Sequence, residues 1–241
     1  MNSHLAQKLR EGTKKAHTAA ENVGFVKCFL KGVINQESYR KLVASLYFVY
    51  SEMEAQIHRH QSHAIVSQIY FPQLDRQSSL EKDLRFYYGD RWQSQVTSSP
   101  ATQVYLQRIQ DISNTEPELL IGHVYTRYMG DLSGGQILKG IAQRAMGLKA
   151  GQGTAFYDFD DIADEKEFKV IYRQRLNELP LSESTVNRIV EEANVAFEMN
   201  MKLFQEIEGN FIKAIGQVLY NQLTRRRTSN DANGTAAVFT E

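Results

Sequence analysis

The chain has 241 residues, of which 42% are hydrophobic, and this is enough to bury the core of one large domain or two small ones. Its 28 basic residues balance its 28 acidic residues, which excludes the strongly basic class of nucleic-acid-binding proteins. The longest apolar run, from Leu42 to Tyr50, is far shorter than the roughly 20 residues of a membrane span, so we expect neither a nucleic-acid nor a membrane partner.

The first half of the chain has the apolar spacing of helices. Ser3 is expected to cap a first helix that runs to about Glu21, and a second helix covers roughly 23–34. A third is expected from Gln36 to about Arg59. Its apolar side chains recur at steps of three and four, which marks a core face: Tyr39, Leu42, Val43, Leu46, Tyr47, Tyr50, Met53 and Ile57. The stretch 62–76 is ambiguous.

The second half continues with helices. "SSLEKDLRFYYG" and "PATQVYLQRIQDI" predict two of them, and "TEPELLIGHVYTRY" opens a long one with Thr115 and Glu118 at capping-box spacing. Gly147 is expected to end that helix. "GLKAGQGTAFYDFDD" reads as a connecting loop, followed by helices over about 164–178 and from Ser184 to beyond Phe211. With no strand periodicity, the sequence predicts a single all-α domain over 1–224 and a disordered tail over 225–241.

The only cysteine is Cys28, which excludes an internal disulfide bond and suits a reducing compartment. The N-terminal sequence "MNSHLAQKLREGTKKAH" lacks the apolar core and the cleavage site of an export signal. We therefore expect a cytoplasmic protein.

A candidate metal ligand lies near the N-terminus. At helical spacing, Arg10, Lys14, His17 and Glu21 share one stripe. An imidazole can bind a metal through one nitrogen while the other donates to a carboxylate such as Glu21, one turn further on. Arg10 lies about 10 Å from His17 along the axis, a length that suits a porphyrin with its iron on His17 and a propionate near the cation. A basic helix face that carries an uninvolved histidine remains the alternative.

The stretch "YTRYMGDLSGGQ" places Gly130, Gly134 and Gly135 inside the predicted long helix, where each glycine costs roughly 1 kcal/mol relative to alanine. A kink or a helix end would explain them, and so would a flat group that lies against bare backbone. If His17 holds haem on one face, this segment can cover the opposite face. Asp131 would then lie beside bound O2 and order the waters that deliver protons.

Two further groups of residues allow both a functional and a structural interpretation. Lys169 and Arg173 share a helix face and indicate either an anionic ligand or a solvated surface. His58, His60 and His63 lie at a helix end without a carboxylate or cysteine at ligand spacing, which favours ordinary exposed histidines over a metal site.

Three segments resemble the biliverdin-forming haem oxygenases, in particular the soluble bacterial and cyanobacterial type. "KKAHTAAE" at 14–21 resembles their proximal helix, "EPELLIGHVYTRYMGDLSGGQ" at 116–136 their distal helix, and "FKVIYRQRL" at 168–176 their propionate-contact helix. The resemblance covers nearly all of the chain before the tail. It implies the all-α haem oxygenase fold, with haem held between a proximal and a glycine-rich distal helix.

Carried over by position, the resemblance implies a role for each candidate residue. His17 becomes the iron ligand and Glu21 its hydrogen-bonding partner, while Asp131 organises the distal waters. The resemblance makes Gly130, Gly134 and Gly135 the distal backbone, and it gives Tyr50 and Arg127 the support of the water network. The propionate contacts are Arg10, Tyr125, Lys169 and Arg173, and Phe197 lines the distal pocket.

The resemblance implies O2- and electron-dependent cleavage of haem b at the α-meso carbon to biliverdin IXα, CO and Fe²⁺, which supplies bilin precursors. The sequence carries no flavin, nicotinamide or iron–sulfur motif, so the electrons come from another protein. The implied partners are ferredoxin, docking near Arg10, Lys14 and Lys15, and a downstream bilin reductase. Two rival functions stay open: a haem carrier, store or sensor without turnover, and an all-α scaffold that binds no haem. Asp131 beside its glycines favours the oxygenase, because a carrier has no use for an acid there.

Overall fold

Helices are the regular secondary structure of the described part of the chain. The computed structural model describes residues 4–234, with side chains placed up to residue 208, and this part of the chain contains α-helices and short 3₁₀ turns without a strand. The α-helices are α1 (Leu5–Gly12), α2 (Lys14–Glu21), α3 (Gly24–Leu30), α4 (Gln36–Arg59), α5 (Gln77–Tyr88), α6 (Pro100–Thr115), α7 (Leu120–Met146), α8 (Glu165–Glu178) and α9 (Glu183–Gly234). The predicted all-α fold is confirmed.

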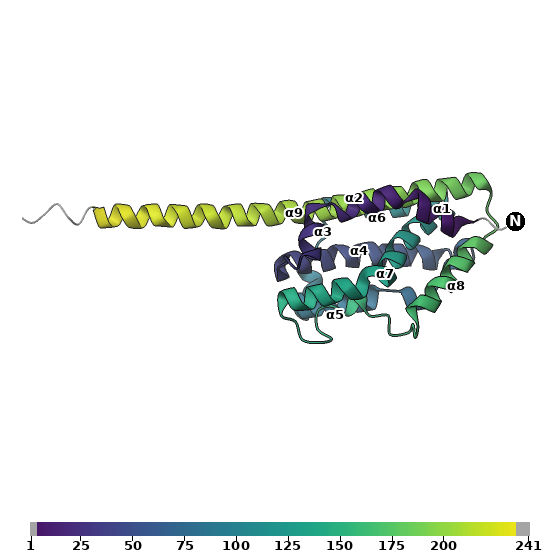
Figure 1. Cartoon of the computed structure of the whole chain (residues 1–241), viewed down its shortest axis with the longest axis horizontal. Helices are drawn as coiled ribbons and strands as arrows, with labels where there is room; N and C mark the ends of the chain where they lie inside the picture. Colours follow the sequence, from purple (N-terminus) through teal and green to yellow (C-terminus); the bar gives the residue numbers. More distant parts are fainter. Residues whose placement is uncertain (1–3, 235–241) are drawn as a thin grey trace, which may run out of the picture.

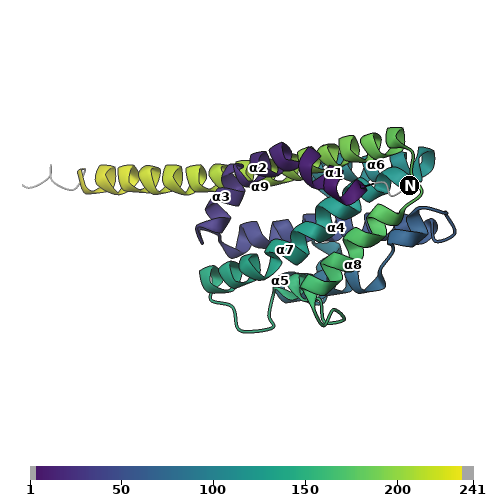
Figure 2. The same ribbon diagram turned by 45° about the vertical axis from the view of Figure 1, so that its right-hand side comes forward.

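The long helix α9 is the element on which much of the domain is assembled. It packs against α7, α1, α2, α3, α4 and α6, and Figures 1 and 2 show α1 and α2 running alongside it at the top of the domain. Helix α4 crosses the middle, α5 lies on the side away from α9, and α7 runs from its contact with α9 towards α5 (Figure 1). The outer part of α9 continues beyond the body of the domain. Both α2 and α7, the helices with the candidate residues, therefore share α9 as a support.

The first predicted helix is wrong in one respect, because it is divided into α1 and α2 at Thr13. The Thr13 hydroxyl donates to the carbonyl oxygen of Leu9 at 2.8 Å, a bond that competes with regular helix geometry. Beside it, Gly12 lies so close to Val190 of α9 that an added Cβ would collide with that side chain. Ser3, the predicted cap, lies outside the described residues.

The predicted capping box at Thr115 is also wrong. Thr115 is the last residue of α6, and its hydroxyl donates to the carbonyl oxygen of Asp111 at 2.8 Å instead of capping the next helix. A 3₁₀ turn, η4 (Pro117–Leu119), then leads into α7. The predicted end at Gly147 is confirmed: its φ of 63° is left-handed, and Leu148 N donates to the Gln143 carbonyl at 2.9 Å, as in a Schellman motif.

At two other boundaries, a polar side chain caps the helix that follows. Asn35 caps α4 by accepting from Ser38 N at 2.8 Å, and Ser99 caps α6. The ambiguous stretch 62–76 contains the 3₁₀ turns η1 (Val66–Ile69) and η2 (Pro72–Leu74), and α3 ends at Leu30, earlier than predicted. Two more turns are η3 (Trp92–Ser94) and η5 (Ala155–Tyr157), the latter inside the predicted connecting loop.

At the C-terminal end, α9 continues to Gly234 and so includes 225–234 of the segment expected to be a disordered tail. This stretch contains no proline, and Gly234 is its first glycine, so no helix breaker stands earlier. Residues 235–241 lie outside the described part, and the domain boundary at 224 stays a prediction. Across residues 4–234, each helix is too short or too polar to span a lipid bilayer.

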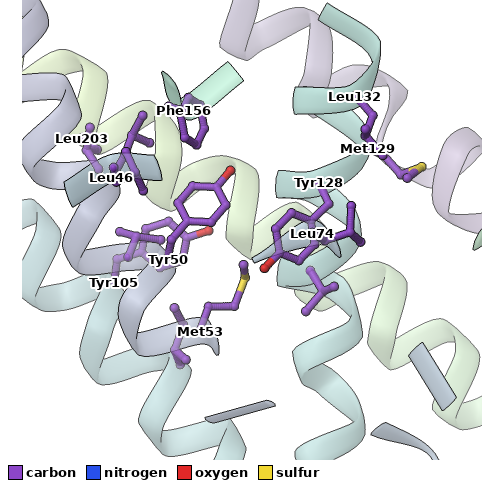
Figure 3. Close-up of a cluster of buried hydrophobic side chains, with 14 of the residues drawn as sticks. Leu46, Tyr50, Met53, Leu74, Tyr105, Tyr128, Met129, Leu132, Phe156 and Leu203 are labelled. Atoms are coloured by element: carbon purple, nitrogen blue, oxygen red, sulfur yellow. The ribbon is translucent and has the colours of Figure 1, made fainter. Parts of the chain in front are cut away.

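The core joins α4 to α7 through aromatic side chains. Figure 3 shows Tyr50 of α4 between Phe156 and Tyr128. The centroid of the Tyr50 ring lies 5.3 Å from the centroid of the Phe156 ring and 5.8 Å from that of the Tyr128 ring. Met53 lies beneath the two tyrosines in the same view. All four side chains are buried, so the core fixes the position of α7 relative to α4.

Helices α7 and α9 cross closely at a glycine that the sequence reading did not single out. A Cβ on Gly122 of α7 would lie 2.8 Å from Ala193 N and 3.0 Å from the Ile189 carbonyl oxygen of α9. Only a glycine therefore lets the two backbones approach this closely.

We expect Gly122→Ala to lower the free energy of unfolding by about 1–3 kcal/mol, because the added methyl group meets backbone that has no rotamer to change. Urea denaturation measures the effect. Gly130→Ala on the same helix is the matched control, since a Cβ there meets nothing within 4 Å, and we expect it to leave stability within about 1 kcal/mol. Equal losses in the two variants would contradict the crossing as the cause.

Candidate functional site

Helix α2 presents His17 to the outside of the packed core. None of its eight residues is buried, and the His17 side chain is 58% exposed. His17 Nδ1 lies 3.6 Å from Glu21 Oε1, one turn further on, as the spacing predicts. The ring of Phe197 from α9 meets the His17 ring edge-on, with centroids 5.9 Å apart. Phe197 thus lies on the His17 side of the site, and its expected place in the distal wall stays a prediction.

The three glycines predicted to form the distal backbone divide into two groups. Added Cβ atoms on Gly130 and Gly134 would meet nothing within 4 Å, so one face of the helix is bare over a full turn. Gly135 is buried, and a Cβ there would lie 3.3 Å from the ring of Tyr157. The structure places Gly135 against the protein interior, apart from the two open glycines.

Asp131 lies between these glycines and accepts a hydrogen bond from the Tyr50 hydroxyl. Arg127, one turn before Asp131, donates through Nε to the same hydroxyl at 3.0 Å and through Nη1 to Asn200 Oδ1 at 2.7 Å. Its guanidinium carbon is 4.9 Å from the centre of the Tyr50 ring. The carboxyl group of Asp131 is therefore held in place by side chains from α4, α7 and α9.

The charges in this network oppose the effect of burial. Burial raises the pKa of Asp131, and the Arg127 guanidinium and the Tyr50 hydroxyl only partly offset this by favouring the carboxylate. For Arg127, burial lowers the pKa, but the neighbouring Tyr50 and Asp131 oxygens raise it above its ordinary value. Arg127 therefore stays charged next to the Tyr50 hydroxyl, and the carboxyl group of Asp131 can hold or release a proton.

A second buried cluster, which the sequence reading missed, lies nearer the start of α7. His123 is fully buried, with Nε2 2.8 Å from Glu192 Oε1 of α9 and Nδ1 3.4 Å from the Tyr105 hydroxyl. Arg108 of α6 donates through Nε to Glu192 Oε1 at 2.9 Å and also through Nη2 to Oε2. A signal was present, because His123, Arg127 and Asp131 follow one another at steps of four on one helix face.

The Glu192 cluster predicts a pH-dependent loss of stability. Burial alone would raise the pKa of Glu192, but hydrogen bonds from His123 and Arg108 lower it from 4.5 to about 2. A carboxyl group with a lowered pKa in the folded state stabilises the fold above its unfolded pKa, and this stability is lost as the pH falls from about 4.5 towards 2.

We therefore expect Glu192→Gln to lower the free energy of unfolding at pH 7 by about 3 kcal/mol, and by progressively less between pH 4.5 and 3. Urea denaturation at several pH values measures this. Glu198→Gln, at an exposed position on the same helix, is the control and should change stability by less than about 0.5 kcal/mol. A loss that is the same at pH 7 and pH 3 would contradict the assignment.

Two more buried carboxyl groups hold in place the segments that pack around Tyr50 and Gly135. Glu54 of α4 accepts from Arg76 N at 2.6 Å and from the Tyr128 hydroxyl at 3.3 Å, and burial raises its pKa to about 7. Asp83 of α5 accepts from Ala155 N at 2.8 Å and from the next backbone N–H at 2.9 Å. These bonds hold η5 in place, and η5 in turn carries the aromatic rings that contact Tyr50 and Gly135.

The predicted cationic group gathers near Tyr125 of α7. Burial raises the pKa of Tyr125, while the charges of Arg173 of α8 and Arg10 of α1 act in the opposite direction, as expected for cations near its hydroxyl. Lys169 of α8 donates to the Leu132 carbonyl oxygen of α7 at 3.0 Å. Two segments far apart in sequence, α1 and α8, thus bring their cations beside α7.

The remaining histidines have structural partners. His58 Nε2 lies 3.3 Å from Asp75 Oδ2, His60 Nε2 lies 2.9 Å from the Ser113 hydroxyl, and His63 Nδ1 accepts from backbone N–H groups. Within the described residues, no group of three histidine, cysteine or acidic side chains is arranged to hold a metal ion.

An all-α domain with an exposed imidazole on one helix, bare glycines beside a carboxyl group on a second, and cations along one edge has the features of a haem protein. The comparison with known families makes this specific. The family described as heme oxygenase matches residues 3–206, and the chain therefore belongs to the haem oxygenase family.

The relatives agree with this family. The chain is 65% identical over 228 residues to heme oxygenase 1 of Nostoc sp., covering 95% of this chain and 96% of the relative. It is 61% identical to heme oxygenase 1 of Synechocystis sp., covering 95% of both chains.

Solved structures match as well. The crystal structure of Synechocystis heme oxygenase-1 in complex with heme superimposes with a TM-score of 0.86 at 61% identity, covering 91% of this chain and 99% of that one. The Synechocystis heme oxygenase-2 complex with heme and NO also gives a TM-score of 0.86, at 49% identity and 92% coverage of each chain. The protein is thus an oxidoreductase that converts haem to biliverdin.

Proposed function

We propose that the chain binds haem b between α2 and α7 and cleaves it at the α-meso carbon to biliverdin IXα, CO and Fe²⁺. The observation that carries this proposal is the Asp131 carboxyl group, held by Tyr50 and Arg127 beside the open face of Gly130. A carrier would not need a positioned acid at this place, so the same observation counts against a haem store or sensor without turnover.

The residues present suit haem in three ways. The bare face at Gly130 and Gly134 has room for a flat ring against the backbone. His17 can ligate iron through Nε2 while Nδ1 stays with Glu21, the arrangement typical of metal-binding histidines. Anionic propionates suit the cationic edge formed by Arg10, Tyr125, Lys169 and Arg173.

When bound, haem supplies both the iron that activates O2 and the ring that is oxidised. The chain's own residues bind, orient and deliver protons. Asp131 orders the distal waters and passes protons through them, and Tyr50 and Arg127 keep its carboxyl group in one position. The backbone at Gly130 and Gly134 limits the space above the ring. The propionate contacts set the rotation of the ring and so the carbon that is attacked.

Electrons must reach this site from a partner protein, and we propose ferredoxin. Arg10 of α1 and Lys14 and Lys15 of the His17 helix are exposed and form a basic surface for an acidic donor. A bilin reductase that takes up the product, a role in supplying bilin precursors, and a cytoplasmic location complete the proposal.

The experiment uses the purified full chain. Haemin is titrated in while the visible spectrum is recorded, and then ferredoxin, its reductase and NADPH are added in air. The proposal expects a 1:1 complex with a Soret band, followed by the spectrum of biliverdin. A stable complex that never yields a bile pigment would leave the carrier function in its place, and no complex at all would favour a scaffold.

A further inference from the structure

One large apolar side chain stands out on the surface of α7. Ile137 is 65% exposed, the highest value among the exposed large hydrophobic side chains of the described residues. It follows Gly130 and Gly134 on the same stripe of the helix, since the positions 130, 134 and 137 are four and three residues apart. The bare face of the helix therefore ends at an isoleucine.

The direction of the side chain brings it to the border of the bare face. In a helix the Cα–Cβ bond tilts towards the N-terminus, so Ile137 leans over the turn that contains Gly134. A Cβ on Gly134 would still meet nothing within 4 Å. Ile137 thus borders the open segment without covering it.

An earlier part of the same helix lies near cations. Tyr125, whose hydroxyl is subject to the charges of Arg10 and Arg173, stands 12 residues before Ile137, roughly 18 Å along the axis at 1.5 Å per residue. From Tyr125 to Ile137, α7 passes from a segment near cations, through the bare face at Gly130 and Gly134, to an apolar side chain. Haem has the same polarity, with both propionates on one edge and only methyl and vinyl groups on the opposite edge.

Contacts between the cationic edge and the propionates do not determine which of two orientations the haem adopts. Turning haem over about its α–γ meso axis returns both propionates to the same edge but exchanges methyl and vinyl groups elsewhere on the ring. Cations therefore hold the two orientations equally well, and only an apolar contact can distinguish them. A β-branched side chain is suited to this, because its shape is fixed by few rotamers.

We infer that Ile137 is a specificity-determining residue: it contacts the apolar edge of haem and sets the ratio of the two haem orientations. The inference rests on the proposed binding of haem between α2 and α7. It assigns to Ile137 a role in binding, separate from the protons delivered through Asp131.

The test compares Ile137→Ala and Ile137→Phe with the parent chain, each loaded with haemin and cyanide. Proton NMR of the shifted haem methyl groups gives the ratio of the two orientations, and transfer of haem to apomyoglobin gives the dissociation rate. We expect Ile137→Ala to change the ratio at least about twofold and to speed dissociation at least about fivefold, because apolar contact is lost. Ile137→Phe should change the ratio as well.

Val104→Ala on α6 is the matched control, since Val104 is 52% exposed and lies on another helix. It should leave the ratio and the dissociation rate as in the parent, and urea denaturation should show all variants folded. Parent-like ratios and rates in both Ile137 variants would overturn the inference while the proposed function stood. A parent chain that takes up no haemin would overturn the proposed function, and the inference with it.

Discussion

Replacing His17 by alanine is expected to abolish conversion of haem to biliverdin while the fold remains intact. The variant loses the proposed iron ligand, and we expect turnover to fall at least about a hundredfold. The side chain is largely exposed, so the free energy of unfolding should change by no more than about 0.5 kcal/mol. Visible spectra of the haemin complex and biliverdin yield with the ferredoxin system measure the effect.

Rescue makes the His17 experiment specific. Free imidazole can occupy the position of the missing ring and should restore both the spectrum and part of the turnover. Glu21→Gln should give a smaller loss, because it weakens only the partner of His17 Nδ1. His58→Ala is the control, since His58 pairs with Asp75 away from the site. Full activity of His17→Ala without imidazole would remove His17 as the ligand.

Replacing Asp131 by alanine is expected to lower the yield of biliverdin by about 10²–10³-fold while haem still binds. The variant removes the group proposed to order the distal waters, so oxygen consumption should continue with oxidised products other than biliverdin. Tyr50→Phe should give a smaller loss, because it removes one hydrogen bond to the carboxyl group and keeps the carboxyl group itself. Product analysis by chromatography, with oxygen uptake recorded in parallel, measures the effect.

Measurements of stability distinguish a catalytic role of Asp131 from a purely structural one. Burial raises the pKa of Asp131, which means that the folded chain holds its carboxylate at a cost. Asp131→Asn should therefore be as stable as the parent chain or more stable, and yet poor in biliverdin formation. Unchanged biliverdin yield in the alanine variant would remove Asp131 from the mechanism.

Features set by neighbours along the chain could be predicted from the sequence. The pairing of His17 with Glu21 follows from one helical turn, the core face of α4 from its apolar period, and the end of α7 from Gly147. The resemblance then gave the family, which the comparisons confirmed.

What the sequence did not reveal depends on contacts between distant helices. Gly122 shows its purpose only where α9 crosses α7, and Asn200 acquires its role only when it meets Arg127. The division of the first helix at Thr13 likewise reflects the approach of Gly12 to Val190. Gly135 shared a motif with Gly134, but the rotation of the helix between them turns it towards Tyr157.

Helix α9 contacts both sides of the proposed haem site within a single turn. Phe197 meets the His17 ring and Asn200 meets Arg127, and the two lie three residues apart, about 4.5 Å along the axis. A rotation or shift of α9 would therefore move the proximal and distal walls together and leave the spacing between them constant. Attempts to widen the site for a bulkier porphyrin should accordingly act on α2 or on the open face of α7, because changes in α9 would disturb the proposed iron ligand and the proposed proton-delivering group at once.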